Sequence, residues 1–253
     1  LPAAVSNVTV GAGHTAAILS DGTLWTWGSN QEGQLGAETQ ETGVDREGNQ
    51  VAVSGTSLAV LEDVRSVAAG GDFTDGTLWA WGGNDYGQLG NGTVVSTAQP
   101  VQVLDQVTAV SAGDYHVAAI RADGTLWTWG DNLYGQLGDG TLNSVSAPQQ
   151  VLDNVTAVSA GANAIAAVRS DGTLWTWRDN LYGQLGDGTR DSMSAPHQVL
   201  TDVRFAVMGD YHAAAISTDG TLYTWGSNLD GQLGNGGLGD TTDEGTGAML
   251  QLT

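Results

Sequence analysis

The sequence predicts an all-β protein, a β-propeller of about five four-stranded antiparallel blades, and two observations carry this prediction. First, Asp-Gly-Thr begins at residues 21, 75, 123, 171 and 219, and Gly-Gln-Leu-Gly begins twelve residues after each. Second, each unit contains short β-prone runs between glycine-rich segments, with no helical periodicity. Because sheets this small are unstable alone, they must pack on one another, as propeller blades do.

The third unit shows the elements expected in each blade. Residues 107–112 and 117–120 are β-prone runs that predict two strands. Asp123-Gly124 predicts a two-residue hairpin with positive φ at both positions, and it leads into a third strand at 126–129. Residues 149–152 predict a fourth strand. The repeats of this single domain, residues 1–253, then span approximately 5–61, 64–104, 107–152, 155–200 and 203–252.

Tryptophan is placed regularly in the repeats. Eight of the nine tryptophans form Trp-x-Trp pairs in the third strands, and Trp225 pairs with Tyr223. Since side chains alternate along a strand, both rings of a pair lie on one face. We expect these rings to fill the seams between blades.

Composition excludes several classes of partner. The 253 residues carry 7 basic and 28 acidic side chains, a net charge of −21, and every basic residue is arginine. Such a field repels nucleic acid and anionic lipid. There is no cysteine and no apolar run of the roughly 18 residues that a membrane helix needs. We therefore expect no nucleic-acid partner, no disulfide and no membrane insertion.

The motifs also carry a family resemblance. Val-x-x-Val-x-Ala-Gly-x-x-His followed by Asp-Gly-x-Leu-Trp-x-Trp-Gly-x-Asn-x-x-Gly-Gln-Leu-Gly is similar to the regulator-of-chromosome-condensation repeat, over residues 5–252, and suggests a bacterial-type member. The resemblance implies a propeller of seven such blades, so the five repeats form either a closed five-bladed ring or an arc of a seven-bladed one. Members of the family act in nucleotide exchange on a small GTPase at chromatin, in ultraviolet sensing in plants, and in inhibition of β-lactamases. The negative charge opposes the first role, and tryptophans at core positions oppose the second.

Three departures from the repeat stand out. The first unit holds extra residues within 37–57, which predict a surface loop or a partner-contacting excursion. In the second unit Thr74 runs directly into Asp75-Gly76, so either another segment replaces strand two or the sequence lacks residues here. Arg178 stands where the other units have glycine. If that position needs positive φ, arginine costs about 1 kcal/mol or more.

No pattern of catalytic residues emerges. The chain lacks cysteine, lysine, a Gly-x-Ser-x-Gly elbow and a His-Glu-x-x-His motif. One histidine per blade seldom converges on a metal ion. We therefore expect no enzyme activity, no cofactor and no metal.

The candidate binding residues lie at the turns between strands one and two, which point to one face of a propeller. They place a carboxylate beside an aromatic ring, and in two repeats a histidine follows: Asp72, Phe73, Asp114, Tyr115, His116, Asp210, Tyr211 and His212. The histidines are also expected to hydrogen-bond backbone of their own or a neighbouring blade. In the inhibitor relative, turn aromatics contact the partner, and the resemblance implies this role for Phe73, Tyr115 and Tyr211.

The function expected from these features is non-enzymatic binding of a protein or glycan through one face, by a propeller that is exported or exposed at the cell surface. Rigid aromatic rings are typical of protein interfaces. The alternative is a structural module of a larger surface assembly or filament. Self-association would then have to overcome the repulsion between like charges.

Overall fold

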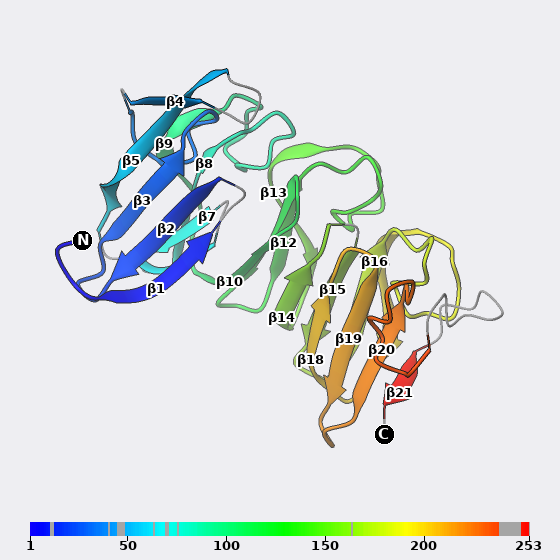
Figure 1. Cartoon of the computed structure of the whole chain (residues 1–253). Coiled ribbons are helices and arrows are strands. Elements are labelled where there is room, and N and C mark those ends of the chain that lie inside the picture. The colour runs from blue at the N-terminus through cyan, green and yellow to red at the C-terminus, as the bar shows by residue number, and fades with distance from the viewer. Residues whose placement is uncertain are drawn as a thin grey trace. The chain divides into compact units, whose positions relative to one another are not determined.

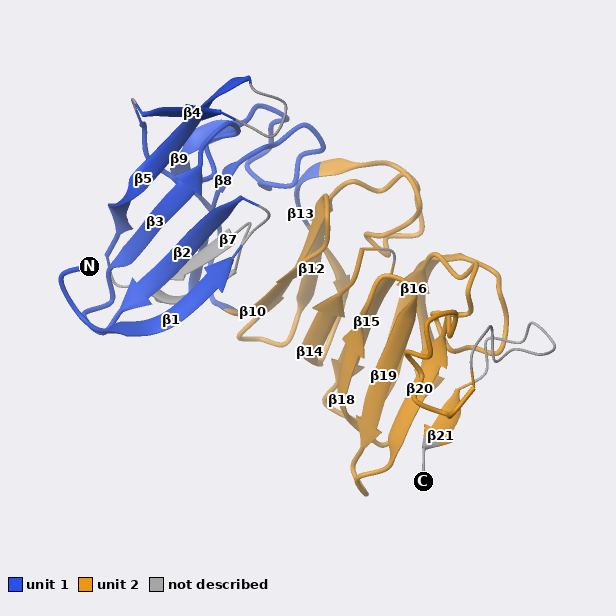
Figure 2. Cartoon of the chain, in the orientation of Figure 1, with its two compact units in different colours: residues 1–107, 146–148 blue, residues 108–145, 149–253 orange. Residues whose placement is uncertain are grey.

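The computed structural model describes residues 1–10, 13–39, 41–44, 49–62, 64–68, 71–74, 76–162, 164–237 and 249–252, of which 64–68, 71–74 and 252 are described by their backbone. Every regular element in these ranges is a β-strand. The chain divides into two compact units, residues 1–107 with 146–148 and residues 108–145 with 149–253 (Figure 2). The assignment of the whole chain to a single domain stays a prediction.

Each repeat folds into one antiparallel sheet (Figure 1). The first sheet has the order β1 (Val5–Val10), β2 (His14–Leu19), β3 (Leu24–Ser29), β5 (Gln50–Leu61) and β4 (Thr42–Val44). The second contains β6 (Val64–Ala68), β7 (Gly71–Thr74), β8 (Thr77–Gly82) and β9 (Thr97–Leu104).

The three remaining sheets repeat one plan. The third contains β10 (Val107–Ala112), β11 (His116–Arg121), β12 (Leu126–Gly130) and β13 (Val145–Leu152). The fourth contains β14 (Val155–Ala160), β15 (Ala164–Arg169), β16 (Leu174–Arg178) and β17 (Met193–Leu200). The fifth contains β18 (Val203–Met208), β19 (His212–Ser217), β20 (Leu222–Gly226) and β21 (Leu250–Leu252). The all-β propeller fold with one sheet per repeat is confirmed; its closure as a ring or arc stays a prediction.

The Asp-Gly hairpins differ from the expectation. Arg121 N–H donates to the Thr125 carbonyl, so the loop has three residues, and only Gly124 has positive φ, at 80°. Asp123 instead accepts hydrogen bonds from the Thr125 backbone N–H (3.0 Å) and hydroxyl (2.6 Å). These bonds hold the pKa of the Asp123 carboxyl below its usual value. The loop is therefore a common three-residue hairpin turn whose last residue has a left-handed backbone conformation. The Asp123 side chain stabilises this turn by accepting hydrogen bonds that the backbone does not supply.

Strand two of the second sheet is formed by another segment, which was one of the two alternatives that the sequence left open. Gly71–Thr74 forms β7, which pairs with both β6 and β8. The strand is short, and it uses the residues that were expected to form a turn. Asp72 pairs with Trp79 and Phe73 with Leu78, so neither lies at the turn between strands one and two. Their side chains lie outside the described part of the structure.

The extra residues of the first repeat also form regular structure. They extend β5 to twelve residues and add β4, which pairs with it from Thr42↔Ala52 to Val44↔Gln50. The predicted surface loop is therefore largely a two-stranded extension of the sheet. Long backbone ladders form here because the added residues are rich in β-branched side chains.

The tryptophans of each pair play different parts. The second ring of the pair is at most 1% exposed in the third and fourth sheets, where it is Trp129 and Trp177. The lone Trp225 of the fifth sheet is equally buried. Trp177 packs among Ala118, Ile120 and Leu126 of the third sheet, in a seam between the third and fourth sheets. The first ring of a pair is half-buried, and Arg169 lies over that of Trp175 at 5.4 Å. Full burial is reached only at the second position, by Trp129, Trp177 and Trp225, whereas Trp27 and Trp81 are half-buried.

Candidate functional site

The candidate site lies at one edge of the sheets in the second unit. The pairs His116↔Gly130 and His212↔Gly226 place the start of strand two beside the end of strand three. The turn before strand two and the loop after strand three therefore emerge at the same edge. This juxtaposition brings two kinds of segment to one surface, of which only the turns were predicted to bind a partner.

A buried asparagine shapes the loop that follows strand three. The Asn132 side chain, 0% exposed, donates to Asp139 Oδ1 (3.1 Å) and to the Thr141 carbonyl (3.2 Å), and its Oδ1 accepts from Leu137 N–H (3.0 Å). Gln136 Oε1 accepts from Tyr134 N–H at 2.9 Å. Because these bonds hold the loop from inside, its two variable residues are turned outward. Leu133 is 61% exposed and Tyr134 67%.

The same network recurs at Asn180 and Asn228. It presents Leu181 and Tyr182 in the fourth repeat and Leu229 in the fifth. These loop residues were not predicted as binding residues. The signal was available, since the two positions before Gly-Gln-Leu-Gly vary between repeats while the asparagine before them and the Gly-Gln-Leu-Gly after them are constant.

The turns behave partly as predicted. Asp114, Tyr115, Asp210 and Tyr211 are exposed, with Tyr115 at 49% and Tyr211 at 46%. Tyr211 meets Tyr182 edge to face, with ring centroids 5.1 Å apart, so a turn of the fifth sheet contacts a loop of the fourth. We call this surface the tyrosine face, defined by turn and loop residues that are all exposed except the half-buried Tyr182: Asp114, Tyr115, Leu133, Tyr134, Leu181, Tyr182, Asp210, Tyr211 and Leu229.

The two predicted histidines are less exposed than the turn residues that precede them. His116 is 1% exposed, so its ring cannot touch a partner directly. Its burial and the nearby charge of Arg178 lower its pKa to about 3. His212 is half-buried. His116 Nε2 has no hydrogen-bond partner among the described residues, so the expected backbone bond from this atom is not formed.

Arg178 lies directly beneath the tyrosine face. It is 6% exposed, and its guanidinium carbon lies 6.0 Å from the centre of the Tyr134 ring. Burial lowers the pKa of Arg178, and the carboxylates of Asp131, Asp179 and Asp114 oppose this shift. Among the described residues its Nε and Nη1 have no hydrogen-bond partner. The arginine supports the Tyr134 ring from below without itself being presented to solvent.

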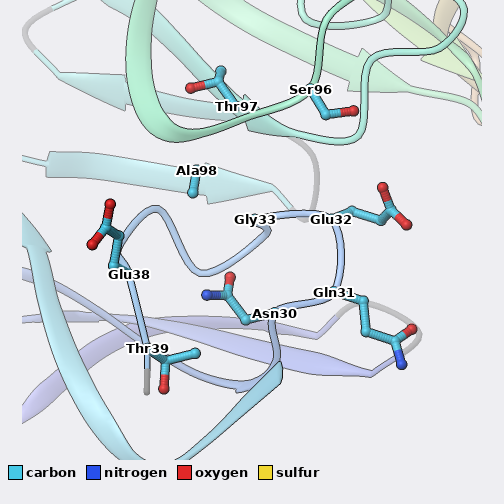
Figure 3. A pocket seen from close by; sticks show the side chains of 9 residues that line it. All are labelled: Asn30, Gln31, Glu32, Gly33, Glu38, Thr39, Ser96, Thr97 and Ala98. Atoms are coloured by element: carbon cyan, nitrogen blue, oxygen red, sulfur yellow. The ribbon is translucent and has the colours of Figure 1, made fainter. Parts of the chain in front are cut away.

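A separate hollow of about 400 Å³ lies in the first unit (Figure 3). Its lining is polar and carries the carboxylates of Glu32 and Glu38. Several of its polar groups are engaged inside the fold: Asn30 donates to the Ala37 carbonyl at 2.9 Å, and Thr39 donates to the Val53 carbonyl at 2.7 Å. No aromatic ring is among the residues that line this hollow, and we prefer the tyrosine face as the site.

Neither a metal site nor a membrane span is found within the described ranges. There, no three histidine, cysteine, aspartate or glutamate side chains are grouped so as to hold an ion. The described part of the chain also offers no membrane-spanning helix. The chemistry of the tyrosine face is therefore that of rings, leucines and aspartate carboxylates.

Comparison with known proteins gives a consistent family. The model for the RCC1-like domain matches residues 2–251. From Arabidopsis thaliana, the mitochondrial RCC1 domain-containing protein RUG3 is 32% identical over 126 residues, covering 46% of this chain and 28% of that protein. The ultraviolet-B receptor UVR8 of the same plant is 31% identical over 131 residues, covering 47% and 28%. The chain thus matches little more than a quarter of the length of these relatives.

Solved structures agree on the fold. Human WBSCR16 superposes with a TM-score of 0.79 at 25% identity, covering 98% of this chain and 67% of that one. Prp20p from Saccharomyces cerevisiae, whose structure was described with its binding to Gsp1p and histones, gives a TM-score of 0.69 at 19% identity, covering 98% and 76%. At that identity the second likeness shows the fold alone.

Proposed function

The chain belongs to the RCC1-like domain family, and from this premise we propose that it is a non-enzymatic propeller that binds a protein partner through its tyrosine face. The observation that carries the proposal is the contact between Tyr182 and Tyr211, which joins a loop and a turn from two sheets while Tyr211 stays 46% exposed. Rings fixed in this way lose little entropy on binding, which is why tyrosines dominate interface hot spots.

The charge of the surface supports the choice of partner. Asp114 and Asp210 stand beside the exposed rings, in a chain of net charge −21. Carboxylates around an aromatic centre steer a positively charged protein surface toward it and disfavour acidic competitors. A protein of this family has been solved bound to another protein, Kap60 with yeast RCC1. A glycan that stacks on the rings is the second possible ligand.

We also propose that the protein works outside the cell or at its surface. The support is compositional: the chain lacks lysine and cysteine, and it holds the sequons Asn7-Val8-Thr9, Asn91-Gly92-Thr93 and Asn154-Val155-Thr156. Fractionation of the source cells followed by immunoblotting tests this. Recovery of the protein only from the cytosolic fraction would refute it.

The binding proposal is tested by capture from the native extract with the purified chain as bait. The combined substitution Tyr115→Ala, Tyr134→Ala and Tyr211→Ala should abolish capture of the specific partner, because it removes three exposed rings and no buried ones. Thr201→Ala, at the exposed connection after β17, is the control and should capture normally.

Thermal unfolding of both variants completes the test. The midpoints should stay close to that of the wild type, since all four side chains are exposed. Undiminished capture by the tyrosine variant at an unchanged midpoint would rule out the tyrosine face. Prior digestion of the extract with glycosidases, compared with proteases, identifies a glycan ligand if there is one.

A further inference from the structure

The fourth repeat departs from its two neighbours in the second unit at linked positions. Before strand two, the sequences of the third and fifth repeats have a tyrosine followed by a histidine, whereas the fourth has Asn163 and Ala164 at the same places. Ala164 pairs with Arg178 across the β15–β16 ladder, and Arg178 stands where the other four repeats have glycine. One repeat has thus lost the turn tyrosine and, opposite Ala164, gained an arginine.

This arginine is costly to the fold. Arg178 has a φ of 96°, which side chains disfavour, and its buried guanidinium has no hydrogen-bond partner at Nε or Nη1 among the described residues. Glycine, the residue of the other repeats, avoids both costs. Residues that lower stability in this way are commonly those that serve a function.

The fifth repeat shows what the missing turn tyrosine does. Tyr211 meets Tyr182, the loop ring of the preceding repeat, edge to face with ring centroids 5.1 Å apart. The equivalent loop ring one repeat earlier is Tyr134. No tyrosine of the fourth repeat can make the same contact to Tyr134, because the sequence has Asn163 at the place of Tyr211.

Arg178 makes a different contact to Tyr134 from the same repeat. Its guanidinium carbon lies over the ring, 6.0 Å from the centroid, within the range of a cation–π interaction. The charge of Asp131 raises the pKa of Arg178 against the effect of burial. Asp131 is itself fixed, since it accepts hydrogen bonds from Gln136 at 2.7 Å and Ser144 at 3.1 Å. The cation is therefore kept beneath the ring.

We propose that Arg178 is a positioning residue, whose buried cation fixes the Tyr134 ring as Tyr211 fixes the ring of Tyr182. Tyr182 is half-buried, whereas Tyr134 is supported from below and stays 67% exposed. Tyr134 is thus the better placed of the two rings to anchor a partner. A ring that is ordered in advance loses less entropy when a partner docks. This benefit to binding rests on the proposed function of the tyrosine face, but the ordering of the ring does not.

Ring motion tests the proposal without any partner. NMR relaxation of the chain, labelled at its six tyrosines, reports ring motion on the picosecond to nanosecond timescale, and Tyr134→Phe assigns the signal. In the wild type the Tyr134 ring should be as ordered as that of Tyr182. Arg178→Gly should lower the order parameter of Tyr134 below about 0.6 and leave Tyr182 unchanged. Tyr211→Ala is the reciprocal control, which should loosen Tyr182 and leave Tyr134 unchanged.

Arg178→Met separates the charge of the side chain from its bulk. Methionine keeps a long unbranched side chain at the same backbone position but carries no cation, so the Tyr134 ring should loosen here as well. A Tyr134 ring that stays ordered in the glycine or the methionine variant overturns the proposal. A ring that is already mobile in the wild type overturns it too.

Binding gives the second measurement. The partner that the wild type captures from the native extract, once purified, serves as the probe. It should dissociate about two- to tenfold faster from Arg178→Gly than from the wild type, although the variant is expected to be the more stable protein. Equal dissociation rates overturn the positioning role. If the wild type captures no partner, the proposed function fails, and the ring measurements alone then decide the role of Arg178.

Discussion

Arg178 pairs with Ala164 across the β15–β16 ladder, at the position where the first, third and fifth sheets pair a glycine with a histidine. Its φ is 96°, within reach of the 97–113° of the equivalent glycines 28, 82, 130 and 226. The positive φ of this position in the repeat is therefore kept at Arg178, although arginine disfavours it. The predicted strain at this arginine is confirmed by its positive φ.

Arg178→Gly should stabilise the protein by about 1 kcal/mol or more, because it removes both the strained φ and a buried guanidinium with unpaired nitrogens. Arg178→Ala keeps a Cβ at positive φ and relieves only the second cost. Chemical denaturation of the three proteins measures both steps. A glycine variant no more stable than the alanine variant would show that the backbone is not strained.

Gly130→Ala should destabilise the fold by several kcal/mol. A Cβ at this position would collide with the Tyr115 carbonyl oxygen and lie 2.8 Å from His116 Cα, in addition to the strain at φ 105°. Gly92→Ala is the matched control, since its φ is 80° and a Cβ there meets nothing within 4 Å. Denaturation midpoints should fall much further for Gly130→Ala, and equal losses would contradict the close approach of the two strands.

Stability should fall as the pH drops from about 7 to about 5, partly through His116. The folded pKa of this ring is lowered to about 3, so in that window the unfolded chain binds a proton that the folded chain does not. The loss from this one group is on the order of 2 kcal/mol. His116→Asn should show a shallower dependence over the same window. NMR titration of the ring should show no protonation there, and a midpoint near 6.5 would contradict the burial.

Asn132→Ala should cost several kcal/mol, because it leaves the Leu137 N–H and two backbone carbonyls of the loop without their partner. Asp139→Asn should be nearly neutral, since Asn235 accepts the same bond in the fifth repeat, from Asn228 at 3.1 Å. Thermal unfolding compares the two. Equal losses of stability in the two variants would show that the loop depends on the negative charge of Asp139 and not on its position as a hydrogen-bond acceptor.

Much of the architecture was predictable from periodicity. The five units, the strand at 107–112, the second half of the strand Val145–Leu152 and the exposure of Tyr115 and Tyr211 all follow from local pattern and repeat spacing, because alternation and turn chemistry act over a few residues. The segment that forms β7 could not be identified from the sequence, because a sheet pairs with whatever backbone lies beside its open edge. For the same reason Asp72 and Phe73 lie within β7 and not at the predicted turn, and their role in binding stays a prediction.

The sequence by itself determined how many sheets form and which side chains line their edges, since each sheet is built from one local stretch of chain. Only the tertiary structure decided that His116 is buried, that Tyr182 meets Tyr211, and that Leu222 is left uncovered while Leu174 is not. These facts depend on what the neighbouring sheet places opposite each residue. Identical motifs acquire different environments because burial is a property of the seam between two repeats and not of either repeat alone.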